Sequence, residues 1–100
     1  MQIQVNFSHV DGSDALDEHV RTELDSAIGR FADRITRIEA HLADENAHKS
    51  GSHDKRVRLE ARPAGRDPIM VEAHGEDFYD TVADAAGKLR RALTSRLERD

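Results

Sequence analysis

The chain ends in HGEDFYDTVADAAGKLRRALTSRLERD, residues 74–100, and this stretch predicts a long amphipathic helix. Its apolar residues recur in steps of three and four, a spacing that places them on one side of a helix. These residues are Phe78, Val82, Ala85, Leu89, Leu93 and Leu97. Arg91 falls on the opposite side, so we expect one buried face and one charged face.

The same helix begins acidic and ends basic. Asp77, Asp80 and Asp84 lie in its first half, whereas Lys88 to Arg99 holds five basic residues and one acid, Glu98. Cations near a helix C-terminus interact favourably with the helix dipole, which is a purely structural explanation. Arginine also suits bidentate phosphate contacts, which is a functional explanation. The basic residues are Lys88, Arg90, Arg91, Arg96 and Arg99.

Length and composition indicate one domain spanning residues 1–100, with 37% hydrophobic residues to form its core. The chain has no cysteine, which excludes disulfides, thiol catalysis and cysteine-ligated zinc. The opening MQIQVNF lacks the features of a signal peptide, and no stretch is apolar enough to span a membrane. We therefore expect a cytoplasmic protein without a membrane partner.

The net charge of −5 is unevenly distributed along the chain. Residues 1–50 carry five Lys/Arg against ten Asp/Glu, whereas residues 51–100 carry ten of each. Most of the protein would thus repel a polyanion, while the C-terminal end would not.

Alternation of apolar and polar residues predicts four strands. They are Gln2 to Ser8, Arg37 to Ala43, Lys55 to Arg62, and Ile69 to Ala73. A further helix follows Ser13, a favourable N-cap, and its apolar stripe continues from Leu16 to Ile35. The order β-α-β-β-β-α predicts an α+β fold in which two helices are packed on one face of a four-stranded sheet.

The outer face of this sheet invites a catalytic hypothesis, because Glu39, Glu60 and Glu72 would lie close together on it. General acid–base catalysis needs a dry, concave site, whereas these residues alternate with arginines on an open face. Cross-strand salt bridges are the better interpretation. We expect no catalytic residue.

Six histidines invite a metal hypothesis. His48 and His53 lie in the polar segment Asp44 to Asp54, but their spacing matches no zinc signature. His41 and His74 fall on the outer sheet face, where they would be cross-strand neighbours. We expect no metal site and no cofactor.

The order of elements and several segments resemble a known family. The segments are MQIQV, SDALDEHV leading to FADRI, and HGEDFYDTVADAAGKLRRAL. They are similar to the short form of the ribosome hibernation-promoting factor and ribosome-associated inhibitor family, also called sigma-54 modulation proteins. The resemblance covers nearly the whole chain.

The resemblance implies two near-parallel helices on one side of the sheet. It also implies binding to the small ribosomal subunit near the decoding centre, where the protein overlaps mRNA and tRNA positions. Such proteins silence translation in stationary phase or stress, and basic residues of both helices contact ribosomal RNA phosphates.

Residue by residue, the resemblance implies an RNA-binding set on both helices. Acidic residues stand where the family usually has Lys or Arg in the first helix, namely at Asp17, Glu23 and Asp25, so the chain resembles a divergent acidic member. In the final helix, Lys88 and Arg91 stand at the family's basic positions and Arg99 falls on its basic tail. Arg90 and Arg96 add charge nearby, and Arg21, Arg30 and Arg34 remain in the first helical segment. We expect these eight residues to bind ribosomal RNA.

Two functional hypotheses follow. The first is a non-enzymatic hibernation factor that binds the small subunit, contacting 16S-type RNA and nearby ribosomal proteins. The second is a protein-interaction or self-associating module that has the same fold and does not bind RNA. Its surface would be the sheet face with Arg56, Arg58 and Arg62, or an edge strand that pairs between chains. The sequence leaves the oligomeric state open.

Overall fold

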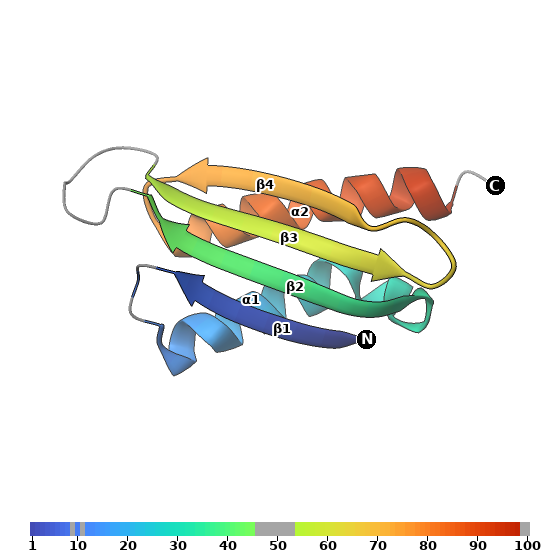
Figure 1. Cartoon of the computed structure of the whole chain (residues 1–100), viewed down its shortest axis with the longest axis horizontal. Coiled ribbons are helices and arrows are strands. Elements are labelled where there is room, and N and C mark those ends of the chain that lie inside the picture. The colour runs from blue at the N-terminus through green and yellow to red at the C-terminus, as the bar shows by residue number, and fades with distance from the viewer. Residues whose placement is uncertain (9, 11, 46–53, 99–100) are drawn as a thin grey trace.

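The computed structural model describes residues 1–8, 10, 12–45 and 54–98. Its order of elements is β-α-β-β-β-α, with a short 3₁₀ helix, η1, after the first α-helix, which confirms the predicted α+β fold (Figure 1). The elements are β1 (Gln2–Ser8), α1 (Asp14–Ile28), η1 (Gly29–Arg34), β2 (Ile35–Asp44), β3 (Lys55–Pro63), β4 (Ile69–Gly75) and α2 (Phe78–Leu97).

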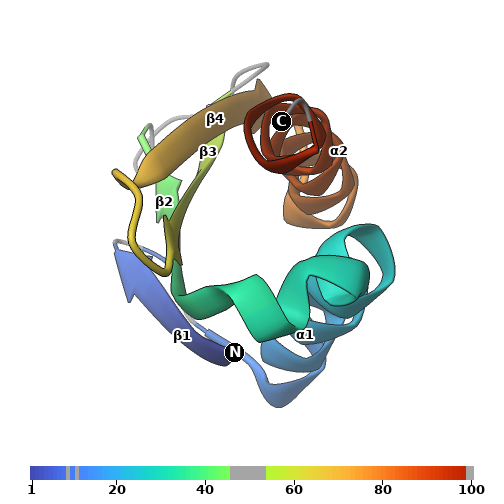
Figure 2. The ribbon, with the colours of Figure 1, turned by 90° about the vertical axis from the view of Figure 1, so that its right-hand side faces the viewer.

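The four strands form one sheet in the order β1-β2-β3-β4. β1 and β2 are parallel, because α1 and η1 carry the chain back between them, and the other neighbours are antiparallel. Both helices cover the same face of the sheet, whose strands curve around them (Figure 2). The opposite face is left to solvent, and β1 and β4 are the two edges.

The core lies between the sheet and the helices, and its sheet side follows the period of two in the sequence. Ile38, Ala40 and Leu42 of β2 are fully buried, as are Val57, Leu59 and Ala61 of β3. Helix residues at steps of three and four cover them, with Val20 and Leu24 from α1 and the whole predicted stripe from α2. The apolar stripe from which α2 was predicted is therefore the face that packs this helix against the sheet.

Each α-helix begins at a side-chain cap. The Ser13 hydroxyl oxygen accepts a hydrogen bond from the Leu16 N–H at 3.0 Å, which confirms the predicted N-cap of α1. Asp77 does the same for α2, where its carboxylate accepts from the Asp80 N–H at 3.0 Å.

The predicted first helix was too long at its C-terminal end. The α-helix ends at Ile28, which has φ −131° and ψ 10°, and a tighter 3₁₀ helix follows from Gly29. Phe31 of this 3₁₀ helix is still buried in the core. Ile35 is no longer helical and is the first residue of β2, opposite Pro63 of β3. Ile35 continues the apolar period of the helix but is out of phase with Ile38, Ala40 and Leu42 of the strand. A register shift in the β2–β3 pairing between Ile35 and Arg37 places it on the buried side.

The histidine pair expected on the outer sheet face does not exist. His41 of β2 is opposite Arg58 of β3, and His74 of β4 is opposite Arg56 of β3. β3 therefore separates the two histidines, because the meander places β2 and β4 on opposite sides of it.

Candidate nucleic-acid interface

The two helical segments run side by side in the same direction, as the resemblance implied. Near their beginnings, the rings of His19 in α1 and Tyr79 in α2 lie 4.7 Å apart. Near their ends, Arg30 of η1 donates to the Thr94 hydroxyl of α2 at 2.9 Å. Their C-terminal ends therefore meet, and so do their N-terminal ends.

A shallow hollow between the C-terminal ends concentrates arginine; we call it the arginine hollow. Arg30 of η1 and Arg90, Arg91, Thr94 and Ser95 of α2 line about 400 Å³. Three of the expected RNA-binding arginines meet here, although Arg30 and Thr94 are 64 residues apart in the sequence. Guanidinium and hydroxyl groups around one hollow are the donors that protein–nucleic acid contacts use for phosphate oxygens.

Arg30, which lines this hollow, is held in place by three neighbours. Its guanidinium carbon lies 4.7 Å from the centre of the Phe31 ring. Its Nη2 contacts the Thr94 hydroxyl at 2.9 Å and the Glu98 carboxylate at 2.7 Å. The Arg30 side chain is nevertheless 57% exposed, so its remaining donors face water.

Arg90 and Arg91 are exposed on the adjacent turn of α2. A Cβ added at Gly87 would lie 3.4 Å from Nη1 of Arg91, so this guanidinium lies back over the glycine one turn earlier. Neither arginine makes an ion pair with any described residue. Both charges are therefore available to an anion.

The C-terminal end of α2 gathers further arginines. Arg34 donates to the Leu97 carbonyl at 3.0 Å, and Arg66 donates to the Arg96 carbonyl at 3.1 Å. Cations at a helix C-terminus stabilise its exposed carbonyls, which is the structural explanation raised for the basic cluster. Arg66 comes from the β3–β4 turn, where Gly65 has φ 73°, and sequence periodicity gave no reason to associate it with α2. The side chain of Arg96 is exposed, and Arg99 lies outside the described residues.

Lys88 and Arg21 do not join the hollow. The Lys88 ammonium donates to the Glu72 carbonyl of β4 at 2.9 Å. Arg21 donates to the Ile3 carbonyl of β1 at 3.0 Å and to the Asp17 carboxylate at 2.9 Å. Because β1 and β4 are the two edges of the sheet, each of these cations covers one edge.

The opposite end of the helix pair is acidic. The pKa of Asp77 lies below its usual value, chiefly because its carboxylate accepts the Asp80 backbone N–H. The pKa of Asp80 is raised, chiefly by its side-chain hydrogen bond with Asp77. In α1, Glu23 lies 3.9 Å from His19, one turn earlier in the same helix. This end therefore offers carboxylates where the other offers guanidiniums.

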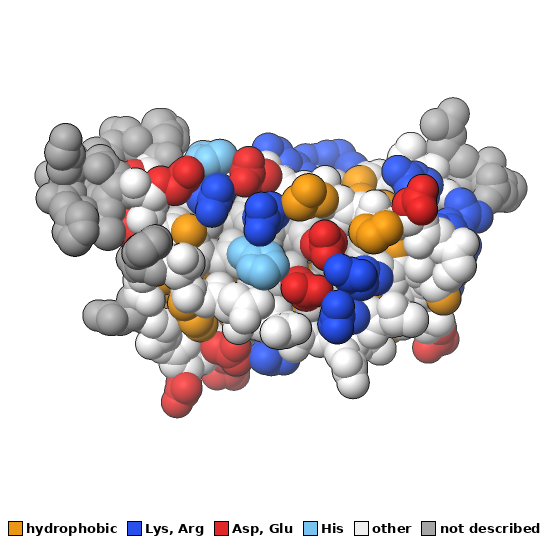
Figure 3. Space-filling model, viewed as in Figure 1, with side chains coloured by type: hydrophobic (Ala, Val, Ile, Leu, Met, Phe, Trp, Pro, Cys, Tyr) orange, Lys and Arg blue, Asp and Glu red, His pale blue; other side chains and the backbone are white. Residues whose placement is uncertain are grey.

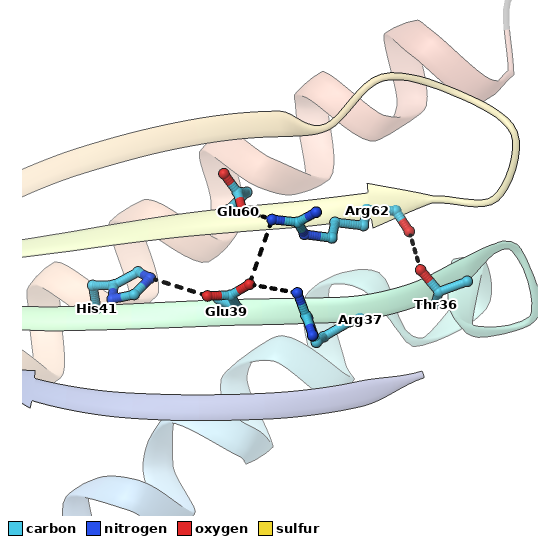
Figure 4. A network of polar contacts seen from close by, with 6 residues as sticks. All are labelled: Thr36, Arg37, Glu39, His41, Glu60 and Arg62. Atoms are coloured by element: carbon cyan, nitrogen blue, oxygen red, sulfur yellow. Dashed lines mark hydrogen bonds and ion pairs between the residues drawn. The ribbon is translucent and has the colours of Figure 1, made fainter.

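The outer sheet face carries both charges, interleaved (Figure 3). Glu39 is a hub, lying 2.9 Å from Arg37, 3.7 Å from Arg62 and 3.6 Å from His41 (Figure 4). Arg62 also pairs with Glu60 at 2.9 Å. The predicted cross-strand salt bridges are confirmed, and they leave these glutamates paired on an open surface.

The remaining glutamate and histidine on this face are also paired. Arg56 lies 3.8 Å from Glu72 and 3.7 Å from Glu45, and Glu45 lies 3.0 Å from His74. No group of three or more potential metal ligands occurs within the described residues, and His48 and His53 lie outside them. No described helix is long and apolar enough to cross a membrane.

The sequence and fold were compared with known proteins. Residues 3–100 match the model of the family "Sigma 54 modulation protein / S30EA ribosomal protein". A ribosomal subunit interface protein from Coxiella burnetii has a similar structure, with a TM-score of 0.79 and 25% identity, over 99% of this chain and 100% of that one. The Protein Y N-terminal domain of Thermus thermophilus shares the fold, with a TM-score of 0.78 and 18% identity, over 96% of this chain and 99% of that one.

No curated protein matches the sequence. The family match nevertheless covers almost every residue, and it agrees with the order of elements and with the helix pair. The chain belongs to the sigma-54 modulation protein / S30EA ribosomal protein family.

Proposed function

We propose that this protein is a ribosome hibernation factor that binds the small ribosomal subunit through RNA phosphates at the arginine hollow. By occupying the positions of mRNA and tRNA, it would silence translation under stress. Its partners would be 16S-type RNA and nearby ribosomal proteins. It would act in the cytoplasm. It works by occlusion, so the proposal requires no catalytic residue, metal or cofactor.

The observation that carries this proposal is the clustering of Arg30, Arg90 and Arg91 around one hollow with two hydroxyl side chains. Protein–RNA affinity depends strongly on the number of phosphates that cations neutralise. Arg34 and Arg96 extend the positive region along the end of α2. This end of the helix pair is thus a local positive region on a protein whose net charge is −5.

The proposed RNA surface is smaller than the set of eight residues expected from the sequence. Arg21 and Lys88 are engaged at the sheet edges by backbone carbonyls. We assign RNA contact to Arg30, Arg90 and Arg91 first, and to Arg96 second. Arg34, like Arg21 and Lys88, is engaged by a backbone carbonyl. The same edge contacts oppose strand pairing between chains, which weakens the alternative of a self-associating module.

Cosedimentation with purified small ribosomal subunits tests this proposal. We expect binding at low salt and an affinity at least about tenfold lower when Arg30, Arg90 and Arg91 are all changed to Gln. The slope of log affinity against log salt should fall by roughly two to three, because each lost phosphate contact removes about 0.7–0.9.

The matched control changes Arg56, Arg58 and Arg62 to Gln on the outer sheet face. This variant removes the same charge from the opposite side of the molecule, and circular dichroism would establish that both variants are folded. Equal losses of affinity in the two variants would contradict a localised RNA surface. Absence of binding by the wild type at low salt would contradict the proposed function itself.

A further inference from the structure

We propose that Glu98 regulates the arginine hollow by occupying the guanidinium of Arg30 as an internal competitor of phosphate. The proposal rests on the proposed function for its biological meaning, and on the geometry of the hollow for its chemistry. The ligand is a phosphate group. The Glu98 carboxylate competes with it, because this carboxylate must leave Nη2 of Arg30 before a phosphate oxygen can bind to that nitrogen.

The contacts of Arg30 resemble those of an arginine that is already bound to an anion. Glu98 Oε1 lies 2.7 Å from Nη2, a short charge-assisted contact, and Thr94 Oγ1 accepts from the same nitrogen at 2.9 Å. A phosphate oxygen in the hollow would seek the same donor. Nη1 and Nε have no acceptor among the described residues, so they stay available to the incoming group.

Glu98 is also the only acid in the segment Lys88 to Arg99. It follows directly after α2, and its backbone N–H donates to the Thr94 carbonyl at 3.0 Å. Its backbone is thus fixed beside Thr94, a lining residue of the hollow, independently of its side chain. The side chain is 44% exposed, so it can swing into water without disturbing the helix.

The exposure of this pair sets the size of the effect. Exposed ion pairs contribute little, because water screens them and ordering two long side chains costs entropy. Releasing Glu98 should therefore change phosphate affinity by a small factor and not by orders of magnitude. Salt should weaken the competition together with the binding.

Titration with inorganic pyrophosphate at about 0.1 M salt, where the Debye length is about 10 Å, tests the competition when it is followed through the arginine Nε–H resonances by NMR. We expect E98Q to bind about two- to fivefold more tightly than the wild type, because Gln keeps the shape and removes the charge. D33N is the matched control. Asp33 is an exposed residue of η1 that makes no ion pair with a described residue, so D33N changes the net charge equally and should alter affinity by less than about 1.5-fold.

The variant R30Q completes the test, since E98Q should have no more effect than D33N when Arg30 is absent. Equal effects of E98Q and D33N in the wild-type background would overturn the proposal, as would the absence of any pyrophosphate-dependent shift of the Arg30 resonance. Cosedimentation separates this result from the proposed function. Competition seen with pyrophosphate but no binding to small subunits would overturn the proposed function alone.

Discussion

The arginine hollow and the outer sheet face contain the same residue type in opposite electrostatic settings. On the sheet, the guanidinium of Arg62 lies among carboxylates from two strands, 2.9 Å from Glu60 and 3.7 Å from Glu39. In the hollow, Arg90 and Arg91 make no ion pair with a described residue, and Arg30 meets a single carboxylate. The number of arginines does not distinguish the two surfaces. The number of carboxylates around each arginine does.

The difference arises from the geometry of the two kinds of element. Adjacent strands place side chains of neighbouring residues about 5 Å apart, so charges of opposite sign on one face pair readily. A helix end has few side-chain neighbours and presents backbone carbonyls, which favour cations without neutralising them. The sheet face is therefore a self-neutralised surface, and the hollow remains positive.

The largest expected effect concerns Glu39, the hub of the sheet network. Changing Glu39 to Gln should lower the free energy of unfolding by about 1 kcal/mol, because Arg37 and Arg62 lose their shared partner. Urea unfolding at low and at high salt would measure this, with the loss shrinking at high salt. Glu76→Gln, at an exposed position, is the control.

The same Glu39 variant sharpens the contrast between the two surfaces. Its affinity for small subunits should match that of the Glu76 control, since both remove one charge and neither touches the hollow. A larger change in affinity for the Glu39 variant would show that the sheet face takes part in binding.

A smaller effect on stability is expected at the sheet edges. Changing Arg21 to Ala or Lys88 to Gln should cost within about 1 kcal/mol, because both side chains are exposed. The informative result is self-association, since each variant uncovers the free edge of β1 or β4. Sedimentation velocity should show dimers at high concentration in the double variant but not in the wild type. A monomeric double variant would contradict the role assigned to these two residues.

The smallest effect is expected at the acidic end. The raised pKa of Asp80 means that charging this carboxyl disfavours the folded state, so stability decreases as pH rises from the ordinary value of 3.8 through the raised pKa. Asp80→Asn should therefore be slightly more stable than the wild type at neutral pH, and this gain should vanish in acid.

Urea midpoints at pH 3 and pH 7 would measure the effect of Asp80→Asn. The lowered pKa of Asp77 acts in the other direction, since its contribution is present above pH 3.8 and disappears as pH falls through the lowered pKa. An Asp80 variant that is less stable at neutral pH would mean that the favourable helix N-terminus outweighs the repulsion between the two carboxyls.

Much of the fold could be predicted from local pattern. The alternation in β3 and the stripe from Phe78 to Leu97 each matched the burial found in the structure. Ser13 was recognisable as a cap because its chemistry acts within three residues. The end of α1 was not predictable in this way, because Ile35 continues the helical period. It joins the strand through a register shift opposite Pro63, far along the chain.

The candidate site was only half predictable. The C-terminal arginines stood out as a cluster in the sequence, and the family resemblance added Arg30. That Arg30 meets Arg90 while Arg21 does not depends on how η1 and α2 are packed against each other. Arg66 was missed altogether, since nothing in a turn sequence shows which helix end the turn will approach.

The sequence by itself determined the order of elements, the buried face of each one and the concentration of positive charge at the C-terminal end. These depend on periodicity and composition, which act over a few residues. Tertiary structure alone decided which cationic side chains remain available to bind an anion. Long side chains such as Arg21, Lys88 and Arg34 reach acceptors on neighbouring elements, and only the packing of helices on the sheet places those acceptors within reach.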